Sequence, residues 1–200
     1  MKISELSAAS GVPIATLKFY LREGMLERGV VTSPTRAEYG QEHLDRVRLI
    51  QALTAVRELP IARVREILAI VDGPLEDPVV ALGQAVAALP PYLADASAHD
   101  RARAAADLLG FVFDPEYPAT AQLEWALEGL ERAGLEWNEG IARRYWEALL
   151  PLAEAEVAPI GDMTGQEAVT YAVLGTALYE PVILALRRLA HRRVAQTDAD

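Results

Sequence analysis

The sequence of 200 residues contains no cysteine. This absence excludes disulfides, metal sites built on thiolates, and redox sensing through a thiol. Three histidines are present, His43, His99 and His191, but they lie far apart and none has a metal-binding partner at helical spacing. The sequence therefore predicts no metal site and no cofactor.

Long hydrophobic runs are also lacking. The most apolar stretch, residues 168–179, is stopped by Glu180 and Pro181, and its length favours a buried helix over a membrane span. The first five residues do not resemble a signal peptide, because they lead directly into a helical pattern. We therefore expect a cytoplasmic protein that has no membrane partner.

Motifs for catalysis are missing as well. The sequence has no Gly-rich phosphate loop, no nucleophile elbow and no recognisable carboxylate dyad. The carboxylates of Glu124, Glu128 and Glu131 are most simply interpreted as a solvated helix face. An enzyme is not expected, although a pocket with paired groups of perturbed pKa would revive that hypothesis.

The net charge of −10 is unevenly distributed. Residues 1–74 hold ten basic and nine acidic side chains, whereas residues 75–200 hold nine basic and twenty acidic ones. The turn Asp72-Gly73-Pro74 coincides with this change and predicts a domain boundary there. We expect one domain over residues 1–74 and a second over residues 75–200, with enough apolar side chains for both cores.

A helix-turn-helix pattern occupies residues 4–26. Gly11 permits a sharp turn, and Pro13 fits the first position of a second helix. That helix carries Leu17 and Leu21 on one face, with cations, hydroxyls and aromatic rings elsewhere around it. This mixture suits a helix that lies in the major groove of DNA, where cations meet phosphates and polar groups reach base edges.

The second helix also carries a motif that points to a family. It reads Thr16-Leu17-Lys18-Phe19-Tyr20, then Gly24-Met25-Leu26, and a polar stretch and two amphipathic runs follow up to Asp72. This part of the chain resembles the MerR family of transcriptional regulators, whose helix reads roughly T-I-R-Y-Y before a Gly-Leu-Leu turn. The resemblance implies a mostly α fold: an N-terminal winged helix-turn-helix, followed here by an all-helical C-terminal bundle.

The resemblance also implies which side chains contact DNA. Two alternatives stay open for one of them, because Tyr20 could reach a phosphate or pack in the core, whereas Phe19 is expected in the core. Ala15 stands where many relatives have an arginine, so the base preference should differ from theirs. The expected DNA-binding residues are Thr16, Lys18, Tyr20, Arg22, Arg36 and Tyr39. Lys2, Arg28, Arg46 and Arg48 are further candidates for a cationic face.

Dimerisation in the MerR family usually uses one long helix. A helix does begin at Asp77-Pro78, but Pro90-Pro91 stops it after about three turns. We therefore expect dimerisation to recruit more of the C-terminal domain. Further helices are expected over residues 95–109 and 119–133, after Asn138, and after the capping box that begins at Thr164.

Aromatic side chains gather in the C-terminal domain. Such a concentration can line a cavity for a planar or hydrophobic ligand, with carboxylates nearby that select a cation. Alternatively the rings simply fill the core between helices. The expected wall of a pocket consists of Trp125, Trp137, Tyr145, Trp146 and Tyr171.

Together these features predict a homodimeric, sequence-specific regulator of transcription. The resemblance implies that the dimer binds a pseudo-palindromic promoter with an overlong spacer and bends or untwists it. RNA polymerase would then meet realigned promoter elements when a small-molecule effector is bound. The alternative is a small-molecule sequestration protein that retains a vestigial DNA-binding head.

Overall fold

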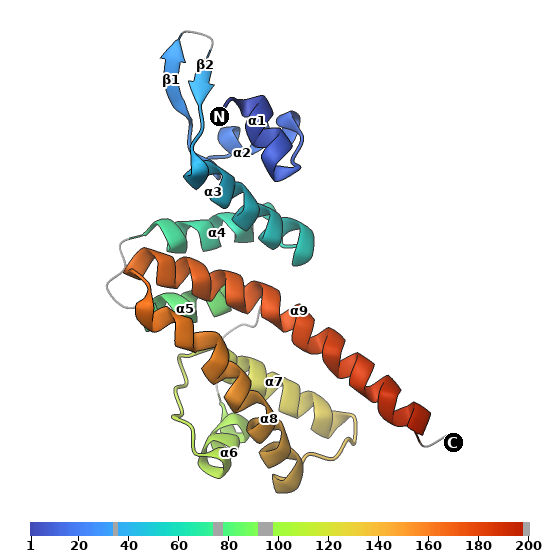
Figure 1. Ribbon diagram of the computed structural model, residues 1–200. Helices are drawn as coiled ribbons and strands as arrows, with labels where there is room; N and C mark the ends of the chain where they lie inside the picture. The colour runs from blue at the N-terminus through green and yellow to red at the C-terminus, as the bar shows by residue number, and fades with distance from the viewer. Residues whose placement is uncertain (34–35, 74–77, 92–97, 198–200) are drawn as a thin grey trace. The chain divides into compact units, whose positions relative to one another are not determined.

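The computed structural model describes residues 1–33, 36–73, 78–91 and 98–197 (Figure 1). These residues form helices and one small two-stranded sheet, which confirms the predicted mostly α fold. The chain divides into two compact units. Residues 1–69 and 177–200 form the head unit, and residues 70–176 form the helical unit. The domain boundary predicted at residue 74 falls within 74–77, outside the described residues.

Two short helices open the head unit. Helix α1 spans Ile3–Ser10 and α2 spans Ile14–Arg22, and Leu6 and Leu17 are fully buried between them and the rest of the unit. Gly24 adopts a φ of +70° just after α2, where the Met25 N–H donates to the Tyr20 carbonyl over 2.9 Å. This left-handed turn ends α2, because glycine adopts such a φ at little steric cost.

A hairpin forms the wing of the head unit. Strands β1 (Val30–Ser33) and β2 (Arg36–Glu38) pair antiparallel, with Val30 opposite Glu38 and Val31 opposite Ala37. Figure 1 shows the hairpin extending beyond α1 and α2. At its base the Tyr39 N–H donates to the Met1 carbonyl over 2.7 Å, which ties the wing to the start of α1.

Helices α3 and α4 support this wing. Helix α3 (Gln41–Gln51) runs into a π-helical turn, η1 (Ala52–Val56). After a break at Pro60, α4 follows over Ile61–Asp72. Ile50, Leu53 and Val64 are fully buried, so the apolar stripes expected on both helices do form the core.

The helical unit contains four further helices and the first part of a fifth. They are α5 (Pro78–Ala87), α6 (Asp100–Leu109), α7 (Pro118–Arg132), α8 (Glu139–Val157) and α9 (Gly165–Thr197), with a short 3₁₀ turn, η2 (Ala158–Asp162), before α9. Asn138 caps α8 by accepting the Ile141 N–H over 3.0 Å, and Glu167 accepts the Thr164 N–H at the start of α9. Both predicted caps are therefore confirmed.

Pro151 lies inside α8, and Pro181 lies inside α9. Helix α8 nevertheless continues past Pro151 to Val157. Each proline removes one backbone donor, so each helix lacks one hydrogen bond in its interior.

Glu124 joins α6 to α7. Its carboxylate accepts the Ala102 backbone N–H and a guanidinium N–H of Arg101, both over 2.9 Å, at the first turn of α6. The side chain is buried, so its interpretation as part of a solvated face is wrong. Burial alone would raise the pKa of Glu124, but these hydrogen bonds outweigh burial and lower the pKa below its usual value. A charged carboxylate thus caps α6 from a neighbouring helix.

Helix α9 is long and unusually apolar. By length and composition alone it could cross a membrane, with a mean hydropathy of 1.6 in its most apolar window. Within residues 168–179, the stretch for which the sequence favours a buried helix, Ala168, Val169, Ala172, Val173 and Ala177 are buried. Over the apolar window of α9 as a whole, the buried share is 22%. A single helix of this kind is weak evidence for a membrane span.

Candidate nucleic-acid interface

One face of α2 is exposed along its whole length. Ile14, Lys18 and Arg22 lie four residues apart on this face, and all three are exposed. Leu17 and Tyr20, on the opposite face, pack into the head unit with 0% and 6% of their surface exposed. This division follows from the helical period, and it presents two cations on one ridge.

Arg22 is held in place by an aromatic ring. Its guanidinium carbon lies 5.6 Å from the centre of the Phe19 ring, within the range of a cation–π contact. Phe19 is half-buried, so it does not serve the core alone as expected. The contact between Phe19 and Arg22 restricts the rotamers of the long Arg22 side chain. The guanidinium N–H donors of Arg22 stay available to acceptors outside the protein.

The cations described within residues 1–69 fall into two groups. Within the described residues, Lys2, Lys18, Arg22 and Arg28 form no ion pair. Those in the other group bind groups of the protein itself. Arg46 donates to the Met25 carbonyl, Arg48 pairs with Asp45, Arg63 pairs with Glu66, and Arg65 pairs with Glu23. The first group therefore has cations available to bind an external anion.

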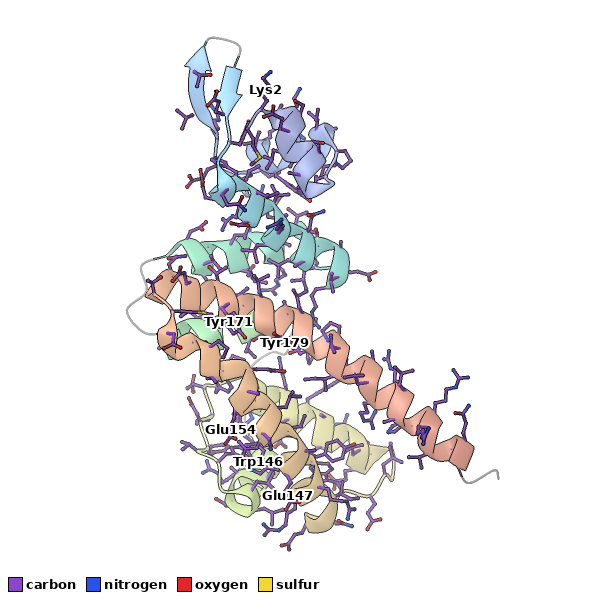
Figure 2. All side chains as sticks on the ribbon, viewed as in Figure 1. Lys2, Trp146, Glu147, Glu154, Tyr171 and Tyr179 are labelled. Atoms are coloured by element: carbon purple, nitrogen blue, oxygen red, sulfur yellow. The ribbon has the colours of Figure 1, made fainter. Side chains whose placement is uncertain are left out.

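The available cations follow α2 and the base of the wing. Figure 2 shows Lys2 beside the hairpin, where the hydrogen bond between Tyr39 and Met1 holds the start of α1. Arg28 precedes β1 and is exposed. Lys2 and Arg28 thus join Lys18 and Arg22 as candidate phosphate contacts. The sequence also offered Arg46 and Arg48 as candidates, and it is their hydrogen bond and ion pair within the protein that distinguish them from this group.

The two tyrosines of the expected site are mostly enclosed. Tyr20 is 6% exposed and packs beside Phe19, with 6.0 Å between ring centres. Tyr39 is 7% exposed. Its ring packs edge to face against the imidazole of His43, with 5.2 Å between the two ring centres. Packing is therefore a large part of the role of both rings, and little of either remains for DNA.

The two remaining residues of the expected site differ in what can be described. Thr16 is half-buried on α2, so part of its side chain stays accessible. Arg36 begins β2, but its side chain lies outside the described residues. Lys18 and Arg22 thus share the exposed ridge of α2, whereas Thr16 lies on another side of the same helix.

The aromatic residues expected to line one pocket are divided among separate places in the helical unit. Trp137 and Tyr145 contact each other with 5.6 Å between ring centres, and Trp146 packs against Phe111 at 5.2 Å. Trp125 is 57% exposed on α7. Figure 2 shows Tyr171 on α9, away from Trp146 on α8. Trp137 alone of the five lines the hollow described below.

Comparisons with known proteins agree with this geometry. Residues 1–69 match the model of the MerR HTH family of regulatory proteins. The crystal structure of SCO5550, a candidate transcriptional regulator from Streptomyces coelicolor A3(2), is similar with a TM-score of 0.75 and 32% identity, over 98% of this chain and 96% of that one. No curated protein matches the sequence. The exposed cations of α2, the adjoining wing and these two similarities lead to one conclusion: the chain belongs to the MerR family of transcriptional regulators.

Proposed function

We propose that the protein binds a pseudo-palindromic promoter as a homodimer, with α2 of each protomer in the major groove. The observation that carries this proposal is the exposed ridge of Lys18 and Arg22, which form no ion pair among the described residues. Both side chains would bind phosphates, while Thr16 would reach toward base edges. In this geometry the two α2 helices lie about 34 Å apart, one helical turn of DNA.

An apolar seam on α9 supports the homodimer. Tyr179, Val182, Leu186 and Leu189 follow one another at spacings of three and four residues, and they are 41%, 50%, 60% and 59% exposed. This spacing is typical of a helix that packs along another helix. Helix α5 offers a shorter surface, because it ends at Ala87. We therefore propose that α9 of one protomer contacts the second protomer.

The same seam explains why α9 is so apolar. The family role requires access to DNA, so a cytoplasmic protein is expected, and a second copy is a better partner for the seam than a lipid bilayer. Size-exclusion chromatography with light scattering tests this point on the full chain. Leu186→Glu should shift the protein to monomers, whereas the control Val112→Glu, at a loop residue that is 91% exposed, should leave the dimer intact. Dimers of both variants would contradict the assignment of this seam.

The proposed regulation follows the MerR mechanism. The dimer would bend or untwist an overlong promoter spacer, so that RNA polymerase meets realigned elements when a small hydrophobic or aromatic effector is bound. Family membership points to a regulator without catalytic activity. The polymerase is thus an indirect partner, which responds to the shape of the DNA.

Titration with the promoter DNA of its own gene tests the DNA-binding role. Nanomolar binding that weakens steeply with salt would support the regulator, because salt dependence reports the number of phosphates neutralised. The variant Lys18→Gln/Arg22→Gln should lose most of this affinity. Binding of small molecules without specific DNA binding would instead support the alternative role, in which the protein sequesters a ligand and the head is vestigial.

A further inference from the structure

The helical unit contains a hollow of about 450 Å³ between α6, α7 and the segment that leads into α8. Its apolar wall includes Ala104, Leu108 and Leu127. Trp137 adds a large aromatic surface, and the contact with Tyr145 at 5.6 Å supports this ring from behind. A hollow of this size and composition is in the range that binds small organic molecules.

Charged side chains also line this hollow, and they carry an excess of negative charge. Arg101, Glu131 and Glu139 all line it. Arg101 is already committed, because its Nε and one terminal nitrogen donate to Glu131 over 2.9 and 2.5 Å while the other terminal nitrogen donates to Glu124. Glu139 pairs with Arg143 over 2.8 Å. Two guanidinium groups thus face three carboxylates.

This arrangement selects the charge of a ligand. The hydrogen bonds to Arg101 reach only one oxygen of Glu131, so its other oxygen can accept a further donor. An anion would have to displace a carboxylate from Arg101 and would meet the repulsion of those that remain. A cation finds carboxylate oxygens at the rim and the face of an aromatic ring beside them.

We propose that this hollow binds a small apolar or aromatic molecule carrying one protonated amine. The apolar part lies against Leu108, Leu127 and Trp137, and the ammonium group donates to Glu131 and Glu139. This hollow would be the site of the effector proposed above, and the amine gives the chemical class of that effector. A regulatory role for the hollow rests on the proposed function. Binding itself is a property of the helical unit, and it is measured without DNA, so the two proposals can fail separately.

Isothermal titration of the full chain with three matched probes tests the proposal. The probes are 1-naphthylmethylamine, the neutral 1-naphthylmethanol and the anionic 1-naphthylacetate, which share one ring system and differ in charge. The amine should bind at least tenfold more tightly than the alcohol and should weaken as salt is added, and the acid should bind most weakly. Equal binding of all three, tighter binding of the acid, or no binding of the amine at millimolar concentration would overturn the proposal.

Variants then locate the site. Glu131→Gln should weaken binding of the amine about fivefold or more, whereas Glu128→Gln is the matched control, because Glu128 lies on the same helix, pairs with Arg132 and does not line the hollow. Glu139→Gln is a second variant that leaves the hydrogen bonds of Arg101 intact, and it too should weaken the amine. Ala104→Phe should abolish binding of the amine and the alcohol alike by filling the hollow. Unchanged affinity in Glu131→Gln and Glu139→Gln, or in Ala104→Phe, would show that the amine binds elsewhere.

Discussion

The head unit and the helical unit use arginine and lysine in different ways. On α2 the cations Lys18 and Arg22 are exposed and form no ion pair within the described part of the chain. In the helical unit Arg101 binds Glu124 and Glu131, and Arg132 binds Glu128. The comparison teaches that the near-neutral charge of the first 74 residues conceals an available cationic ridge. In the helical unit, by contrast, Arg101 links α6 to α7 through two carboxylates, and Arg132 pairs within α7.

Removing the α2 cations should produce the largest effect and test the first half of this comparison. Under the proposed function, Lys18→Gln/Arg22→Gln would remove two phosphate contacts from each protomer and four from the proposed dimer. Affinity for promoter DNA should fall by on the order of a hundredfold to a thousandfold near physiological salt, and the salt slope should drop by about three to four. Fluorescence anisotropy at several salt concentrations measures both quantities.

The matched control is Arg48→Gln, because Arg48 is exposed but pairs with Asp45. This variant should leave the affinity and the salt slope nearly unchanged. If it lowers the affinity as much as the α2 variant does, the distinction between available and paired cations has no functional meaning.

Glu124→Gln tests the second half of the comparison. The amide keeps the size of the side chain but loses the charge that Arg101 and the Ala102 N–H bind. Charge-assisted hydrogen bonds of this kind contribute roughly 1.5 to 3 kcal/mol, so the free energy of unfolding should fall by about that amount. Urea unfolding followed by circular dichroism measures the change. Glu128→Gln, which breaks an exposed pair on the same helix, should cost only about 0.3 to 0.5 kcal/mol.

Acid should weaken the same contact. The pKa of Glu124 is lowered in the folded state, so the stabilisation by its ionised form is fully present above the unfolded pKa of about 4.3 and is lost as pH falls through the folded pKa. The difference in unfolding free energy between the native chain and Glu124→Gln should therefore shrink below about pH 4. A difference that stays constant down to pH 2 would show that the carboxylate charge is not what stabilises α6.

Two glycines sharpen the comparison at the level of the backbone. Gly24 has a φ of +70° at the end of α2, so Gly24→Ala should destabilise the protein by about 1 to 2 kcal/mol although no atom crowds the new methyl group. Gly129 lies inside α7 with open space around it, so Gly129→Ala should stabilise by about 0.5 to 1 kcal/mol. Thermal unfolding of both variants checks these opposite signs, and a shift of the same sign in both would refute the explanation.

Features set by neighbours in sequence could be predicted from the sequence. The caps at Asn138 and Thr164, the turn at Gly24 and the exposure of Lys18 each depend on local chemistry or on the helical period. The buried role of Glu124 could not be predicted, because its partners lie on another helix. Likewise, periodicity identifies the stripe of α9 but does not reveal that Leu186 and Leu189 stay exposed.

The candidate sites show the same limit. Sequence reasoning selected Lys18 and Arg22, which the structure exposes, together with Tyr20 and Tyr39, which it encloses. A motif reports the residue type at a position, whereas burial depends on the helices packed against it. In the helical unit the aromatic content selected Trp137, which lines the hollow. The polar residues that line the hollow carry no signal in the sequence that distinguishes them from surface charges.

The attachment of Glu124 to the first turn of α6 has a consequence for the order in which the chain acquires structure. Helix α6 is ten residues long, and a segment that short is marginal in water by itself. Its stabilising carboxylate is synthesised 22 positions after Ala102. In a nascent chain, the Glu124 carboxylate therefore cannot stabilise α6 until α7 has also emerged from the exit tunnel of the ribosome.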